Sequence, residues 1–128
     1  MNKTIFSTGI FFGVLAVMLG AFGAHGLENL IEADAIDTFE TGVRYQMYHA
    51  FLLLILANTS FVDKPDKKAV FYLISLGVIL FSFSIYLLAM NDLTGFDFKK
   101  IAVLTPIGGV LLISGWILIG IRSFKKRN

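Results

Sequence analysis

Four long apolar runs govern what this 128-residue chain can fold into. They cover residues 5–24, 43–62, 69–90 and 101–121. About 20 apolar residues in an α-helix cross the roughly 30 Å of hydrocarbon in a bilayer. Because lipid cannot hydrogen-bond to an exposed backbone, each run is expected to be helical. The sequence therefore predicts an all-α fold, a four-helix transmembrane bundle that forms one integral membrane domain over residues 1–128.

The composition argues against a soluble domain. Apolar residues make up 56% of the chain, and phenylalanine occurs 13 times. A soluble domain of this length has too little interior to bury that many apolar side chains. The chain contains no cysteine, which excludes disulfides, thiolate metal sites and a cysteine nucleophile.

The first apolar run has a second interpretation, as a cleaved signal peptide. It follows Lys3, and Ala21-Phe22-Gly23 resembles a cleavage site. The apolar core of a signal peptide is usually about 7–15 residues long, which is shorter than this run. The length therefore favours a membrane helix.

Small residues mark two faces for close helix packing. Those of the first run follow steps of four, three, four and three residues, which places them on one helix face. In lipid, small residues let two helix backbones approach closely. The predicted packing residues of the first run are Gly9, Gly13, Ala16, Gly20 and Gly23. Those of the last run are Gly108 and Gly115, which share a helix face with Thr105. Their partner is either another helix of the chain or a second copy of it.

Residues 25–40 separate the first two runs and are acidic. Apolar residues recur there every four positions, which is typical of one helical stripe: Leu27, Ile31, Ala35, Phe39 and Val43. We expect a short amphipathic helix that lies on the bilayer surface or over the mouth of the bundle. Asp37 and Glu40 have the spacing of a capping box, which predicts that the second membrane helix begins near Thr38.

Basic residues are distributed unevenly between the two ends of the predicted bundle. With four spans, the N-terminus, the charged turn at 63–68 and the C-terminal tail share one end, and a short polar loop at 91–100 lies at the other. The first end carries eight lysines and arginines, and the second carries three. The positive-inside rule then predicts a cell-membrane protein with both termini in the cytoplasm. The basic tail is expected to attract anionic lipid head groups rather than nucleic acid.

Polar residues gather where the second run begins, between Thr41 and Ala50. One interpretation is a pocket at the outer mouth of the bundle that binds a ligand or relays protons, since imidazole titrates near neutral pH. Its members would be His25, Glu40, Arg44, Gln46 and His49. The other interpretation is structural. Arg44 then reaches the head groups, neighbouring tyrosines join the interfacial aromatic belt, and His49 bonds to a helix backbone or to Gln46.

Two segments resemble the signature segments of a known family. They are LGAFGAHGL at 19–27 and FETGVRYQMYHA at 39–50. Both are similar to the YgdD-type family of small membrane proteins, which occur in bacteria and, as transmembrane protein 256, in animals. The similarity covers nearly the whole chain and implies an integral membrane protein with about four helices. It implies no activity and no catalytic residues.

No metal or cofactor is expected. Two histidines on adjacent helices at similar depth could ligate haem, and His25 and His49 are the only such pair in the sequence. Histidine is also a routine hydrogen-bonding residue, so one pair is not enough to predict haem. Zinc would need carboxylate ligands in addition and a fixed geometry.

Three function classes follow from these patterns. The main prediction is a helper or structural protein that acts through contacts with lipid, with other copies of itself or with other membrane proteins, as the glycine faces indicate. The alternative is a small transporter or channel, although no run carries a charge near its centre and no inverted repeat is visible. An enzyme is not expected, because the sequence has no nucleophile–base set, phosphate loop or metal motif.

Overall fold

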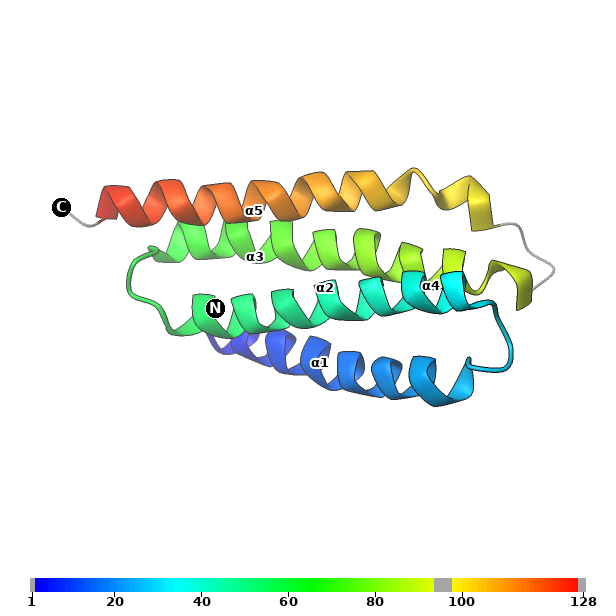
Figure 1. The fold of residues 1–128 in the computed structure, drawn as a ribbon. Helices are drawn as coiled ribbons and strands as arrows, with labels where there is room; N and C mark the ends of the chain where they lie inside the picture. Colours follow the sequence, from blue (N-terminus) through cyan, green and yellow to red (C-terminus); the bar gives the residue numbers. More distant parts are fainter. Residues whose placement is uncertain (1, 94–97, 127–128) are drawn as a thin grey trace.

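A computed structural model describes residues 2–93 and 98–126, and both stretches are built from helices (Figure 1). In chain order the elements are α1 (Asn2–Ala21), η1 (Phe22–Gly26), α2 (Ala33–Asn58), α3 (Lys64–Val78), η2 (Ile79–Phe83), α4 (Ser84–Ala89), η3 (Asn91–Leu93), η4 (Phe98–Ile101) and α5 (Leu104–Lys126). The elements η1 and η2 are π-helical turns, and η3 and η4 are 3₁₀ turns. No strand occurs in the described residues, so the predicted all-α class is confirmed. Part of the predicted loop at 91–100, residues 94–97, lies outside the described residues.

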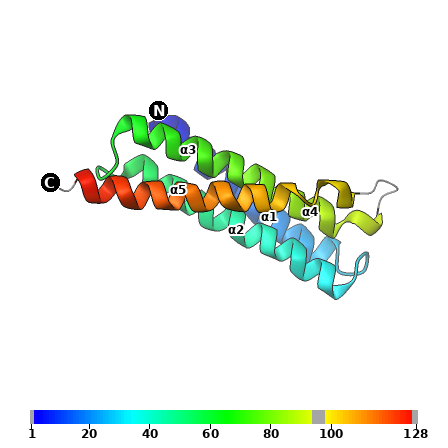
Figure 2. The same ribbon diagram turned by 90° about the horizontal axis from the view of Figure 1, so that it is seen from above.

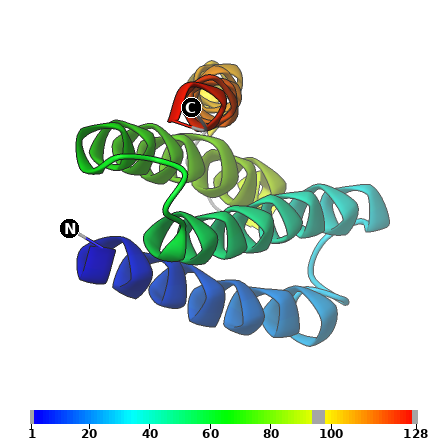
Figure 3. The ribbon, with the colours of Figure 1, turned by 90° about the vertical axis from the view of Figure 1, so that its left-hand side faces the viewer.

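The helices form four rods that lie alongside one another in alternating directions (Figure 1). The first rod is α1 with η1, the second is α2, the third is α3 with η2 and α4, and the fourth is α5. Seen along the bundle, α2 lies between α1 and the third rod, and α5 lies on the far side of α3 (Figure 3). The view from above shows that the rods cross obliquely (Figure 2). α2 and the third rod are therefore the two inner rods, and α1 and α5 are the outer ones.

Three of the four rods are long and apolar enough to cross a membrane. They are Asn2–Gly26, Lys64–Ala89 and Leu104–Lys125. The second rod does not meet this criterion, because polar side chains interrupt its apolar sequence. The rod with the most polar sequence therefore takes one of the two inner positions, where α1 and the third rod shield its polar side chains from lipid. That α2 crosses the bilayer as a fourth span stays a prediction.

The second rod begins earlier than the sequence predicts. We expected a separate amphipathic helix before a membrane helix at 43–62, but α2 runs without a break from Ala33 to Asn58. Asp37 and Glu40 therefore lie inside α2, and the predicted capping box is wrong. The expected apolar stripe does face the bundle, since Leu27 and Phe39 are both fully buried. The stripe belongs to the preceding turn and the first turns of α2, and not to a helix of its own.

The first rod packs on α2 through the small-residue face of the sequence. A Cβ atom added at Gly9 would lie 3.0 Å from the carbonyl oxygen of Ala50. One added at Gly23 would lie 2.9 Å from the ring of Phe39. Between these two contacts, Ala16 is fully buried. The atoms closest to both glycines belong to α2, so the partner of this face is α2 of the same chain. The two backbones are so close that larger side chains would not fit between them.

The fourth rod packs on the third in the same way. A Cβ atom added at Gly115 would lie 2.5 Å from Cδ1 of Ile74. Gly108 lies directly against the backbone of Phe81 and Gly77, where the π-helical turn η2 widens the third rod. Both glycine faces of the sequence are therefore used in contacts within the chain.

Polar side chains tie both ends of the chain to one end of the bundle, which we call the terminal end. The Nζ atom of Lys67 donates to Oδ1 of Asn2 (3.2 Å) and to the carbonyl oxygen of Ala57 (3.5 Å). A lysine is favourable there because the last carbonyls of α2 have no helical partner. Arg122 near the end of α5 forms an ion pair with Asp66 (3.4 Å). These contacts hold the start of α1, the end of α2, the first turn of α3 and the end of α5 together.

Candidate functional site

Gln46 is the most enclosed member of the candidate pocket. It lies in the middle of α2 and is 0% exposed. Its Nε2 atom donates to the carbonyl oxygen of Phe12 in α1 (2.8 Å). Its Oε1 atom accepts from the hydroxyl of Tyr86 in α4 (2.7 Å). An amide without partners in an apolar setting would cost a few kcal/mol, so these two bonds let Gln46 join three helices at one point.

His49 lies one turn further along α2 and is 4% exposed. Its Nδ1 atom lies 2.6 Å from the carbonyl oxygen of Tyr45, and Nε1 of Trp116 donates to its Nε2 atom (3.0 Å). Since a carbonyl can only accept, Nδ1 carries the proton and Nε2 accepts, which is the neutral form of the ring. His49 thus links α2 to α5. The backbone bond is the one that the structural interpretation of the sequence expected.

The other three members of the candidate pocket lie nearer the surface. His25 in η1 is exposed, and Glu40 is half-buried. Arg44 is exposed, and its guanidinium donates to Oγ1 of Thr41 (3.0 Å), three residues earlier on α2. Arg44 therefore does not provide a buried positive charge that could hold an anion inside the bundle.

The structure does not bring the five residues together. Gly23 meets Phe39, so His25 lies level with the first turns of α2. His49 lies ten residues beyond Phe39, which is about 15 Å along the helix axis. The predicted proximity of the two histidines is wrong, because α2 starts at Ala33 and its polar stretch lies deep in the bundle. Gln46 and His49 are both internal, but they contact different helices.

Comparison with known proteins supplies a family. A family model described as "Protein of unknown function (DUF423)" matches residues 19–109. The chain belongs to the DUF423 family. The matched residues include Gln46, His49 and Tyr86, and they end before Trp116.

Bacterial relatives named "UPF0382 membrane protein" align with the DUF423 chain over almost its full length. The relative from Staphylococcus saprophyticus is 38% identical over 96% of this chain and 98% of its own. The relative from Haemophilus influenzae is 38% identical over 91% and 90%. YwdK of Bacillus subtilis is 36% identical over 96% and 98%. No solved structure matches. With its three apolar rods, the chain is a membrane protein of a family whose function is unknown.

Sequence reasoning missed the partners of these polar residues. Besides Tyr86 and Trp116, the buried Ser82 donates to the carbonyl oxygen of Gly42 in α2 (2.8 Å). A serine hydroxyl in a membrane helix more commonly bonds to the backbone of its own helix. A tyrosine, tryptophan or serine inside an apolar run has no spacing that identifies its partner. In this DUF423 chain the available signals were Gln46 and His49, since a polar side chain in such a run must find partners.

The geometry does not favour a metal or haem site. Within residues 2–93 and 98–126, no three histidine, aspartate or glutamate side chains converge on a point that could hold a metal ion. The two histidines lie at different depths, and both ring nitrogens of His49 have protein partners. They therefore cannot ligate one haem without a rearrangement of α2.

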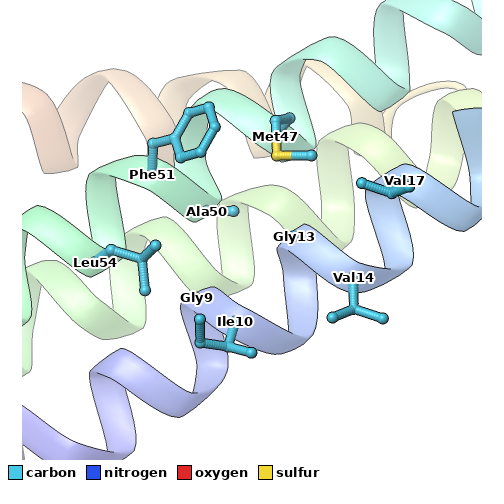
Figure 4. Close-up of a pocket in the computed structure, with 9 residues that line it drawn as sticks. All are labelled: Gly9, Ile10, Gly13, Val14, Val17, Met47, Ala50, Phe51 and Leu54. Atoms are coloured by element: carbon cyan, nitrogen blue, oxygen red, sulfur yellow. The ribbon is translucent and has the colours of Figure 1, made fainter.

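An apolar groove of about 330 Å³ lies between α1 and α2 (Figure 4). Figure 4 shows its residues along the two neighbouring helices: Gly9, Ile10, Gly13, Val14 and Val17 of α1, and Met47, Ala50, Phe51 and Leu54 of α2. None of them carries a charge. The groove is open on its outer side, so in a bilayer it would contact acyl chains or an apolar helix. It offers dispersion contacts and no reactive group.

Proposed function

We propose that this DUF423 chain is a structural or assembly component of the cell membrane, which acts through lipid and helix contacts on its outer faces. The observation that supports this most is the bonding at the centre of the bundle. Both polar ends of Gln46 and both ring nitrogens of His49 have partners within the chain. A transport pathway needs polar groups that can exchange their partners for a substrate or water. The outer surface, in contrast, presents apolar side chains and the groove of Figure 4.

The test of this proposal measures flux through purified protein in liposomes, with protons, potassium and chloride as probes. We expect flux equal to that of protein-free liposomes. Flux that Gln46→Leu or His49→Leu abolishes, while Tyr72→Phe on the lipid-exposed side of α3 leaves it intact, would establish a transporter and overturn the proposal. A catalytic activity that survives purification would also overturn it.

We also propose that all four rods cross the membrane and that both termini are cytoplasmic. Short turns join consecutive rods, so the apolar first and third rods require α2 to return across the bilayer. The terminal end holds most of the basic residues, which supports a cytoplasmic position.

The orientation can be measured with single cysteines, because the chain has none of its own. We predict that Ser60→Cys, in the exposed turn after α2, reacts with a membrane-impermeant maleimide only when the cytoplasmic side is open. Asn29→Cys, in the exposed turn before α2, should react from the outside in intact cells. Reaction of both residues from one side would contradict four crossings.

The YgdD-type resemblance is a finer proposal within this family. Both signature segments, 19–27 and 39–50, lie in the region that the DUF423 model matches. We propose that the YgdD-type proteins and the DUF423 proteins are one family. A joint alignment in which these segments fall at unrelated positions would separate the two.

A further inference from the structure

A crevice of about 190 Å³ lies between α2 and α5 near the terminal end. Its apolar lining comes from Leu52, Ile55 and Leu56 of α2, Phe61 and Val62 of the following turn, and Ile119 of α5. Thr59 and Ser123 add two hydroxyl groups to the lining. The crevice is separate from the groove of Figure 4, which shares none of these residues.

The lining changes from apolar to polar along the bundle axis. Leu52 lies six residues before the end of α2 at Asn58, about 9 Å deeper in the bundle. Thr59 follows the end of α2, and Ser123 lies in the last turns of α5. The apolar part therefore lies toward the bilayer centre, and the hydroxyls lie toward the surface of the terminal end.

The surface beside the polar part is basic. The terminal end carries eight lysines and arginines in the sequence and two aspartates, Asp63 and Asp66. Arg122, next to Ser123, pairs with Asp66, and the side chain of Arg122 is 41% exposed. Arg122 is three residues from Ile119, so the two side chains lie on neighbouring parts of the same face of α5. The excess of positive charge attracts anions at the membrane surface.

We propose that this crevice binds an anionic glycerophospholipid, with one acyl chain in the apolar part and the phosphate near Arg122. The inference rests on the proposed function, because it names one lipid contact of the outer surface. An acyl chain joined to an anionic head group has the same order of apolar and charged parts as the crevice and its rim. A second copy in the same orientation would bring an equally basic terminal end to this surface, so charge repulsion disfavours it.

The test uses the full-length protein in mild detergent, with native mass spectrometry to count bound lipids. Dioleoyl phosphatidylglycerol and dioleoyl phosphatidylcholine have the same chains and differ in head-group charge. We expect phosphatidylglycerol to bind about fivefold more tightly for each basic residue near its phosphate. Glycerol 3-phosphate, which has the anion and no chain, should not compete.

Two pairs of variants separate the chain contact from the charge contact. Ile119→Trp fills the crevice and should lose binding of both lipids, whereas Ile121→Trp on the exposed side of α5 should keep it. Arg122→Gln should lose about fivefold of the preference for phosphatidylglycerol, whereas Lys100→Gln at the opposite end should keep it. The side chain of Arg122 is 41% exposed, so this arm stands even where Ile119→Trp does not fold.

Equal binding of the two lipids by the native chain, or undiminished binding by Ile119→Trp, would overturn the lipid site. A dimer that phosphatidylglycerol does not displace would assign the crevice to a second copy and would also overturn it. If any of these results is obtained and the liposomes show no flux, the lipid site is wrong and the proposed function still stands. Flux would overturn the proposed function whatever the lipid result.

Discussion

At the scale of single residues, Gln46 and His49 each place a polar group where lipid could not satisfy it. Gln46 bonds to the backbone of α1 and to Tyr86, and His49 bonds to its own helix and to Trp116. Hydrogen bonds between membrane helices contribute about 0.6 kcal/mol on average and up to about 1.7 kcal/mol. A buried polar atom that loses its partner costs about 1–3 kcal/mol. These residues therefore matter more for what their loss would cost than for what each bond adds.

Removing the Tyr86 hydroxyl should show this asymmetry. Tyr86→Phe leaves Oε1 of Gln46 without its partner, so we predict a loss of about 1–3 kcal/mol in the free energy of unfolding. Replacing Gln46 with methionine as well removes the orphaned oxygen, so the double variant should be less destabilised than the two single losses added together. Unfolding of the four proteins in one detergent gives the coupling energy. Strict additivity would mean that the two side chains are not bonded.

The bond between His49 and Trp116 has an optical readout, because Trp116 is the only tryptophan. Its ring is 51% exposed at the bundle surface, so in lipid its N–H has no other acceptor nearby. We predict that His49→Leu moves the fluorescence emission maximum to shorter wavelength, since the indole loses its polar partner. His25→Leu, a change of the same kind at an exposed site far from Trp116, should leave the emission unchanged. An unshifted spectrum in His49→Leu would show that the two rings are not in contact.

The residues that sequence could and could not identify differ for a physical reason. Gln46 and His49 stand out because a polar group in an apolar run must be satisfied somewhere. Tyr86, forty positions away, does not stand out, because an aromatic residue in an apolar run is ordinary. The prediction that His25 lies close to His49 was wrong, because the distance between them depends on where α2 begins.

At the scale of the elements, backbone contact at glycines sets how the rods pack. Gly9 and Gly23 hold α1 on α2, and Gly108 and Gly115 hold α5 on the third rod. The π-helical turn η2 lies opposite Gly108, and the backbone of the widened turn fills the space that a side chain at position 108 would need. Close approach of this kind lets dispersion contacts accumulate where no hydrophobic effect drives helices together.

A pair of alanine substitutions on α5 tests these contacts. A Cβ atom at Gly108 would meet the backbone of Phe81, which cannot rotate away, so Gly108→Ala should destabilise the bundle by about 1–3 kcal/mol. Gly120 lies on the same helix with no atom within 4 Å of its added Cβ. Gly120→Ala should therefore be neutral or stabilising by up to about 1 kcal/mol. Thermal unfolding in detergent measures both, and equal effects would contradict the predicted packing of α5.

The elements were largely predictable, and the start of α2 was not. Length and hydropathy indicated the apolar rods, and the small-residue spacing indicated a packing face of α1. Asp37 and Glu40 have the spacing of a cap, yet both lie beyond the first turn of α2, which begins at Ala33. Residues with this spacing also occur inside helices, so the spacing alone cannot distinguish a helix start from the interior of a longer helix.

At the scale of the whole molecule, the arrangement places the most polar rod, α2, between α1 and the third rod. The polar side chains of α2 are held by α1, α4 and α5. The outer faces are apolar, and the charges gather at the two ends. Gln46 and His49 are thus satisfied by contacts within the chain, and the proposed function predicts that no path for water runs through the bundle.

The measurement that tests this central claim most directly is the water accessibility of Ser82 in native membranes. Ser82 is fully buried between the third rod and α2, and cysteine is close to serine in size. We predict that Ser82→Cys does not react with a water-soluble maleimide from either side, while Ser60→Cys in the exposed turn reacts fully and serves as the control. Labelling of Ser82→Cys at a rate near that of Ser60→Cys would show a water-filled path to the bundle centre and would contradict the account.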